Sequence, residues 1–332
     1  MAPRARKPEK LSRRQLNRAT LARQLLLERE PISSVAALER LCGMQAQEPR
    51  PPFIGLWSRV EGFAREDLLG ALEGRQAVRA LLMRATLHLV SAADYPALQG
   101  ALRPVLAQAL SARGTLAKGL ELDALLPVAR ELLAGEPHTF NELRPLLAKR
   151  FPEVNERALG YAVRTHLPLV MVPTEDRWGF PRDSSFALAS EWLGDEPAEA
   201  KGPQALVLRY LAAFGPADAS DAQTWCGLRG LKEVMEELRP KLRSFKDGRG
   251  RELFDLPDAP RPDEDVTAPA RFLPDFDNLV LAHADRTRVL SDDHRAEVVT
   301  KNLRVRATFL WDGFVAGTWR LERKGKKASL EL

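Results

Sequence analysis

Residues 203–256 have the sequence PQALVLRYLAAFGPADASDAQTWCGLRGLKEVMEELRPKLRSFKDGRGRELFDL. Apolar residues recur at helical spacing in its first two thirds, and two short alternating runs around a Gly-containing turn follow. Pro203 suits the first turn of a helix, because that position needs no backbone N–H. The pattern predicts helices at Gln204–Phe214, Asp218–Cys226 and Leu231–Leu238, and strands at Lys241–Lys246 and Glu252–Leu256. Three helices followed by a hairpin is the element order of a winged-helix unit.

The same order is predicted near the N-terminus. Ser12 and Gln15 form a capping box, which opens a helix running to about Arg29. The further elements predicted here are a helix from Ser34 to Gly43, a helix near Asp67–Leu72 and a strand pair over Val78–Val90.

A third copy of the order is predicted between these two. Thr139 and Glu142 form a capping box that opens a helix to Arg150, and Asn155 caps a helix running through His166. Strands are predicted at Leu169–Pro173 and Trp178–Pro181.

The last quarter of the chain differs from the rest. Leu256–Ala270 is rich in proline and predicts a linker, and Arg271–Leu332 is strand-rich, with hairpins expected at Leu279–Leu290 and Ala307–Leu321. We therefore expect a mainly α fold with small β-hairpins (α+β), in which three tandem winged-helix units form a C-shaped arrangement with a β-rich C-terminal region. The expected domains are 1–135, 136–200, 201–258 and 259–332.

Composition limits the classes of protein. The 332 residues carry 50 Lys+Arg against 45 Asp+Glu, a formal net charge of +5, and 45% are hydrophobic, which excludes a disordered chain. No apolar run approaches the ~18 residues of a membrane helix, and the basic start lacks the apolar core of a secretory signal. Cys42 and Cys226 lie in apolar helical patterns typical of buried thiols in a reducing compartment. We expect a cytoplasmic protein with no membrane partner.

The basic excess gathers on the N-terminal arm, over residues 241–251 and in the last third. One winged-helix unit usually binds duplex DNA, with a helix in the major groove and the wing on the backbone. Three units in one chain favour a monomer curved around DNA, and tandem units that bind other proteins are the alternative. On the third wing, Arg249 and Arg251 are the expected phosphate contacts.

The segment Met44–Pro49 carries two glutamines. Gly43 ends the preceding helix and the prolines that follow disfavour another, so the segment should be extended or turned. In an extended segment, Gln45 and Gln47 point the same way and present two carboxamides to one pocket. Such a pair can hold a water or a nucleobase edge, but neither amide is a strong general base. A polar turn leading into a proline loop explains these residues more simply.

Several short motifs follow one another in a fixed order. They are Leu41–Gln47 with Pro52 and Trp57-Ser58-Arg59, Met83–Val90, Phe214–Ala217 with Asp221 and Trp225–Leu228, Phe272–Leu279 with His283–Val289, and Val315–Trp319. In these motifs the chain resembles the AlkZ-type DNA glycosylases, bacterial proteins built from tandem winged helices with a Gln–apolar–Gln catalytic motif. The resemblance spans about Leu11 to Leu321, and Ala85 stands where those proteins often have Gly.

The resemblance implies a monofunctional DNA glycosylase that removes guanines alkylated at ring nitrogen 7, and some members also unhook interstrand crosslinks. Such a base is already cationic and leaves as a neutral product, so the enzyme needs only to place a water and stabilise the sugar. Two neutral amides suit that task, and Gln45 and Gln47 are the expected catalytic residues. A related branch has Asp at the second position. No metal and no organic cofactor are implied.

The resemblance also places His283, Arg286 and Arg288 in a hairpin that the family is thought to insert into the minor groove near the lesion. Asp275 and Asp277 could instead pair with these arginines and form a structural clamp. The expected partner is double-stranded DNA with alkylated bases, bound by a nucleoid-associated monomer. A non-catalytic winged-helix DNA-binding protein, such as a transcriptional regulator, is the alternative function.

Overall fold

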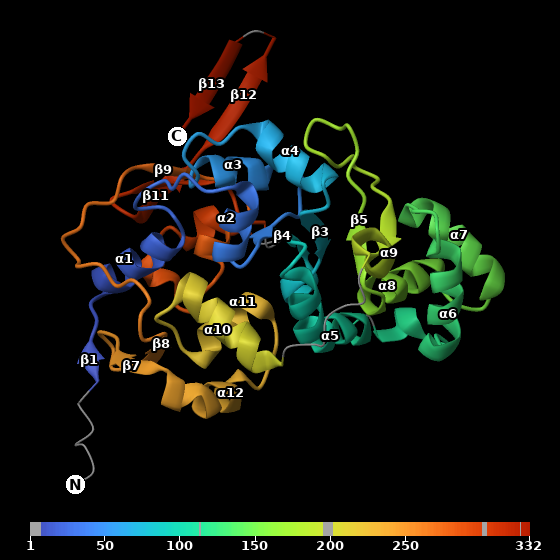
Figure 1. The fold of residues 1–332 in the computed structure, drawn as a ribbon, viewed down its shortest axis with the longest axis horizontal. Coiled ribbons are helices and arrows are strands. Elements are labelled where there is room, and N and C mark those ends of the chain that lie inside the picture. The colour runs from blue at the N-terminus through green and yellow to red at the C-terminus, as the bar shows by residue number, and fades with distance from the viewer. Residues whose placement is uncertain (1–7, 113, 195–201, 301–303, 326) are drawn as a thin grey trace.

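The computed structural model describes residues 8–112, 114–194, 202–300, 304–325 and 327–332. It is a mixed α+β fold in which helices surround several small sheets, as the sequence predicts at the level of class. Figure 1 shows the helices of the middle of the chain on one side, α10–α12 below, and a two-stranded hairpin projecting from the body.

The N-terminal region contains the predicted helices and strand pair. Its elements are β1 (Glu9–Lys10), α1 (Arg13–Arg23), α2 (Ser34–Arg40), β2 (Met44–Gln45), α3 (Pro51–Trp57), α4 (Arg65–Glu73), β3 (Ala77–Leu81), the 3-10 turn η1 (Met83–Ala85) and β4 (Leu87–Ser91). The capping box of Ser12 and Gln15 opens α1 as predicted.

The first helix ends six residues earlier than predicted. Leu25 takes a left-handed conformation with φ 58°, and Leu26 N donates to Leu21 O at 2.9 Å, which closes the helix end. Leu25 is buried in the core. A buried leucine in the left-handed conformation thus stands at the end of α1, where a glycine is usual.

The proline-rich segment was expected to exclude a helix, and this prediction was wrong. Pro51 and Pro52 form the first turn of α3, where a missing N–H costs no helical hydrogen bond. The prolines start the helix that lies beside the Gln-containing segment.

The middle region adds three helices that are not predicted from the sequence, α5, α6 and α9. Its elements are α5 (Tyr95–Ser111), η2 (Gly114–Ala117), α6 (Leu122–Leu133), α7 (Phe140–Arg150), α8 (Glu156–His166), β5 (Leu169–Met171), β6 (Phe186–Leu188) and α9 (Ala189–Leu193). The strand predicted at Trp178–Pro181 is wrong, because Thr174 N donates to Gly179 O and folds this stretch into a loop. The partner of β5 is β6 instead.

One five-stranded sheet joins the N-terminal and middle regions. Its order is β2-β4-β3-β5-β6, and all neighbouring strands run antiparallel. β3 meets β5 with Arg79 opposite Met171 and Ala80 opposite Val170. The sheet therefore crosses the expected boundary between residues 135 and 136.

The third region agrees closely with its prediction. Its elements are α10 (Pro203–Phe214), α11 (Ala219–Cys226), α12 (Leu231–Leu238), η3 (Arg239–Lys241), β7 (Arg243–Lys246) and β8 (Glu252–Asp255). β1 adds to this hairpin as a parallel strand beside β7.

The C-terminal region differs from the prediction in its hairpins. Its elements are β9 (Arg271–Leu273), η4 (Asn278–Val280), η5 (Arg286–Arg288), α13 (Arg295–Val298), β10 (Thr308–Trp311), β11 (Phe314–Thr318), β12 (Arg320–Lys324) and β13 (Lys327–Glu331). The hairpin expected at Leu279–Leu290 is wrong: two 3-10 turns, capped by Asp277 and Asp285, occupy this stretch. β10 and β11 confirm the second hairpin, and β12–β13 is an additional one.

Both cysteines are buried and unbridged, as predicted. Burial raises the pKa of the Cys42 thiol to about 12 and that of Cys226 to about 11. In the described ranges, none of the helices combines the length and the hydropathy of a membrane span.

Candidate active site

The turn before Gln45 brings it to the edge of the five-stranded sheet. Cys42 and Gly43 both have positive φ, and a Cβ on Gly43 would lie 2.6 Å from a methyl carbon of Val90. Only glycine fits this close approach of α2 to β4. β2 then pairs with β4, and Gln45 lies opposite His88.

The side chain of Gln45 is 8% exposed and is held at its oxygen. Its Oε1 accepts a hydrogen bond from Nη2 of Arg84 at 2.6 Å. Because a guanidinium only donates, the amide oxygen faces Arg84 and the amide nitrogen faces away from it.

Gln47 is exposed, and its Oε1 accepts from the backbone N–H of Leu87 at 3.3 Å. Arg79 holds the backbone around it, donating to Ala46 O at 2.8 Å and to Gln47 O at 3.1 Å. Burial lowers the pKa of Arg79 to about 10, and its guanidinium stays charged at neutral pH. The side-chain carbonyl oxygens of Gln45 and Gln47 therefore both face donors of the β3–β4 hairpin, the guanidinium of Arg84 and the N–H of Leu87.

Arg84 reaches Gln45 from an unusual backbone. Its φ and ψ are 56° and 21°, and Ala85 follows with φ 53°. Its second guanidinium nitrogen, Nη1, donates to the carbonyl oxygen of Trp225 at the C-terminal end of α11. That carbonyl lacks a partner within its helix, and the negative end of the helix dipole favours a cation there.

A cavity of about 10 Å³ adjoins Gln45, close to the size that holds one water. Gln45 lines it and Gln47 does not, so the two amides do not share this cavity. Asn278 also lines it and is 5% exposed; its Nδ2 donates to Gly43 O at 3.3 Å, and its buried Oδ1 has no partner among the described residues.

A buried ion pair closes the floor of this cavity. Arg59 donates to both carboxylate oxygens of Asp277, at 3.0 and 2.9 Å, and both residues are almost fully buried. Such a bidentate pair fixes the orientation of the loop that carries Asn278. Asp277 thus pairs with Arg59, not with the arginines of η5.

A larger groove of about 650 Å³ lies between the start of α3 and the base of the β12–β13 hairpin. Four arginines line it: Arg50, Arg304, Arg306 and Arg320. Arg304 pairs with Glu48 at 3.2 Å and with Asp275 at 3.6 Å, whereas Arg50 and Arg306 have no carboxylate partner among the described residues. Glu48, Asp275 and Glu331 line it as well, so the groove is mixed in charge, and it begins next to Gln47 in the sequence.

Two of the predicted DNA contacts are buried. His283 is 1% exposed, and its Nε2 lies 3.0 Å from Phe214 O, to which it donates. Burial lowers the pKa of His283 well below its usual value, so the ring is neutral. Arg288 is also buried and donates to Pro216 O at 2.8 Å. Both side chains hold the C-terminal region against α10.

Arg286 is the exception in this stretch. It is only partly buried, and its Nε and Nη1 atoms have no partner in the described part of the chain. Burial lowers the pKa of Arg286 and that of Arg84, and the charge of Arg286 adds to the lowering at Arg84. Arg286 is thus a cation close to Arg84 with two buried donors that lack a partner among the described residues.

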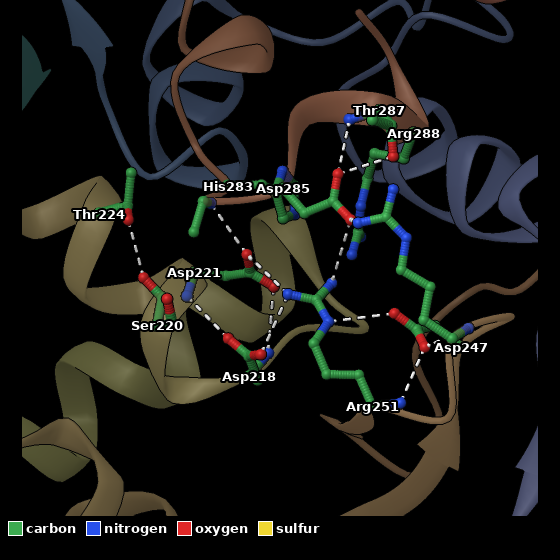
Figure 2. A network of polar contacts seen from close by, with 12 residues as sticks. Asp218, Ser220, Asp221, Thr224, Asp247, Arg251, His283, Asp285, Thr287 and Arg288 are labelled. Carbon is green, nitrogen blue, oxygen red and sulfur yellow. Dashed lines mark hydrogen bonds and ion pairs between the residues drawn. The ribbon is translucent and has the colours of Figure 1, made fainter. Parts of the chain in front are cut away.

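The remaining two predicted contacts, Arg249 and Arg251, lie on the third wing and differ in their surroundings. Figure 2 shows Arg251 surrounded by carboxylates: Asp247 at 3.0 Å, Asp218 at 3.1 Å, Asp221 at 3.7 Å and Asp285 at 4.0 Å. Its charge is already balanced within the protein. Arg249 has a side chain that is 70% exposed and one ion pair, with Asp285 at 3.2 Å.

Sequence reasoning missed Arg84, Arg79 and Asn278. Arg84 and Asn278 lie inside quoted motifs, Met83–Val90 and Phe272–Leu279, but their partners are 39 and 235 residues away. A motif shows that residues occur together in the chain, and only the fold shows which atom each one contacts.

Comparisons with known proteins all point to DNA glycosylases. A family model described as "DNA glycosylase AlkZ-like" matches residues 38–332. The chain is 26% identical over 344 residues to an "Interstrand DNA cross-link repair glycosylase" of Streptomyces sahachiroi, covering 94% of this chain and 88% of that protein. Among solved structures, it is similar to "Streptomyces sahachiroi DNA glycosylase AlkZ", with a TM-score of 0.81 and 22% identity over 97% of this chain and 90% of the other.

Proposed function

The chain belongs to the AlkZ-like family of DNA glycosylases, and we propose on that basis that it hydrolyses the N-glycosidic bond of alkylated purines of the 7-alkylguanine type. It acts as a monofunctional enzyme and leaves an abasic site. The name of its curated relative further supports interstrand crosslinks as substrates.

The observation that carries this proposal is the pair of anchored amides. Gln45 and Gln47 are neutral and are held by donors at their oxygens, and the groove that Arg50 and Arg306 line begins next to Gln47 in the sequence. A cationic base leaves without a general acid, so two amides that place a water and stabilise the sugar suffice. An uncharged base would need a proton donor, and neither amide can supply one.

Double-stranded DNA is the proposed partner, bound by a monomer. Arg286 is partly buried near Arg84, Arg249 is exposed, and Arg50 and Arg306 line the groove. These cations would contact phosphates, which gives affinity without reading sequence. We further propose that the three helix–hairpin units are tandem winged helices in a C-shaped arrangement, with the glutamines on the inner side.

The test is release of 7-methylguanine from methylated duplex DNA, with a crosslinked duplex as a second substrate. Gln45→Ala and Gln47→Ala should each lower the rate by about 10²-fold, as removal of one transition-state hydrogen bond typically does. Gln204→Ala, an exposed glutamine on α10, is the matched control and should keep the wild-type rate.

Two outcomes would count against the proposal. One is wild-type protein that releases no base from either substrate. The other is Gln45→Ala and Gln47→Ala variants that release base as fast as wild type. Tight binding to one DNA sequence, unchanged by the glutamine variants, would instead identify a non-catalytic regulator.

A further inference from the structure

The carbonyl oxygens of both candidate catalytic glutamines are already engaged. Oε1 of Gln45 accepts from Arg84, and Oε1 of Gln47 accepts from the N–H of Leu87. In the described part of the chain, Nε2 of Gln45 makes no hydrogen bond, and it is not among the buried polar atoms that lack a partner. The free side of Gln45 is therefore a donor that solvent can reach.

Arg84 is built to hold this orientation. Its guanidinium has two fixed anchors, Gln45 on one side and the C-terminal end of α11 on the other. No carboxylate pairs with it among the described residues, so its donors are not diverted into an ion pair. A hydrogen bond from a cation also polarises the amide and strengthens its N–H groups as donors.

The backbone around Arg84 is fitted to the same task. Arg84 and Ala85 occupy the left-handed region, which non-glycine residues rarely adopt and which is concentrated at functional sites. A Cβ on Gly227, just after α11, would lie 3.2 Å from Cα of Arg84. The glycine lets α11 approach closely enough for Trp225 O to receive the guanidinium.

We infer that Arg84 is a positioning residue that fixes the Gln45 amide so that it presents its NH₂ group, and not its carbonyl, to the substrate. This inference rests on the proposed function and deepens it. A water held through its oxygen by Nε2 keeps a lone pair for attack on C1′ of the sugar. As the oxygen bonds to C1′, the N-glycosidic bond breaks, its electron pair leaves with the cationic base as a neutral product, and the water gives up a proton to solvent. Gln45 then places the nucleophile as a donor.

A direct test is the side-chain amide signal of Gln45 in a ¹H–¹⁵N spectrum of the full chain, identified by its loss in Gln45→Ala. Arg84→Gln should shift this signal, because the guanidinium contact is lost. Arg144→Gln is the matched control: Arg144 on α7 also donates to one backbone carbonyl, of Phe140, and to one side-chain amide oxygen, of Asn141. It should leave the Gln45 signal in place.

Kinetics provide the second readout. In single-turnover release of 7-methylguanine, Arg84→Gln should lower the rate at saturating enzyme about 10- to 100-fold, as loss of positioning typically does. It should have no further effect in the Gln45→Ala background, because the amide that it positions is gone. Arg84→Lys keeps the charge but cannot span both anchors, so its rate should lie between those of wild type and Arg84→Gln. It serves as the variant if Arg84→Gln does not fold.

The outcomes separate this inference from the proposed function. An unshifted Gln45 signal in the Arg84 variants, or rate losses that multiply with Gln45→Ala, would overturn the positioning role. If Arg84→Gln shifts the Gln45 signal but the wild-type protein releases no base, the proposed function is overturned and the contact of Arg84 with Gln45 is established.

Discussion

Two consecutive residues next to the candidate site, Arg84 and Ala85, have left-handed backbones. Each costs about 1–2 kcal/mol for a residue with a Cβ. At Arg84 the strained backbone occurs together with the hydrogen bond of its side chain to Gln45, so glycine could not replace it. Ala85 has no polar side chain whose contact the strained backbone would serve, and a glycine would relieve the strain at this position.

Ala85→Gly is therefore expected to raise the free energy of unfolding by about 0.5–1 kcal/mol, the relief of strain less the entropy that glycine adds to the unfolded chain. Ala101→Gly, inside α5, is the control and should lower it by about 1 kcal/mol. Urea denaturation measures both. Equal destabilisation by the two changes would contradict the interpretation of Ala85.

His88 makes stability depend on pH. It is completely buried, its Nδ1 donates to Thr86 O at 3.0 Å, and its Nε2 has no partner among the described residues. Burial lowers its pKa to about 3, so the folded protein does not take up the proton that the unfolded chain accepts near pH 6.5. Above pH 6.5 the neutral ring has no effect on stability. The free energy of unfolding decreases as the pH falls from 6.5 toward 3, because the unfolded chain gains a proton that the folded protein does not.

Between pH 7 and pH 5 this difference in the pKa of His88 should lower the free energy of unfolding by about 2 kcal/mol, at 1.36 kcal/mol per pKa unit. His88→Gln should remove that part of the pH dependence, and His294→Gln, at an exposed site, should not. Unfolding curves at the two pH values decide the matter. A His88→Gln variant with the wild-type pH dependence would show that His88 is not responsible.

Several helices that open with a capping side chain could be predicted from the sequence. Ser12, Thr139 and Asp218 cap α1, α7 and α11, and the structure has these helices close to their predicted starts. α5 and α6 have no side-chain cap and contain Pro104 and Pro127, which hide their helical pattern. Tertiary packing decides such helices.

The candidate site was predictable only in part, for a related reason. Gln45 and Gln47 stand in a short motif, and resemblance was enough to single them out. The contacts that orient them cross 39 residues for Gln45 and 40 for Gln47 and depend on positive φ angles that the sequence does not show. The burial of His283 and Arg288 likewise follows from packing against α10 and Pro216, far away in the chain.

The hairpin β12–β13 offers a clean test of DNA contact. Its residues are exposed along almost the whole of both strands, with only Glu322 partly buried. Removing residues 320–332 should therefore leave the free energy of unfolding within about 0.5 kcal/mol of wild type. It removes five Lys and Arg residues and two glutamates.

With these cations lost, the slope of log affinity against log salt should become less steep by about 2–3, since each phosphate contact contributes about 0.9. Fluorescence anisotropy of a labelled duplex at several salt concentrations measures this slope. An unchanged slope would mean that the hairpin does not contact phosphate.

The five-stranded sheet makes the N-terminal and middle regions one cooperative unit. β3 and β5 pair directly, and one apolar core combines residues of α2 and α4 with residues of α7 and α8. Hydrogen exchange should then report the same opening free energy for the slowest amides of β3, β4 and α8.

A substitution in β5 should confirm that coupling. Val170→Ala, at a fully buried site opposite Ala80, should lower protection in all three elements by about 2 kcal/mol. Loss of protection confined to residues 136–194 would mean that the middle region opens by itself.

The exposure of the β12–β13 hairpin also has a consequence for evolution and engineering. Since this ribbon contributes little to any core, its length and charge can change without a penalty in folding, unlike the packed loops around Gln45. Relatives that share the same body can therefore differ in this appendage alone. Exchanging it between two family members should leave the fold of the body intact.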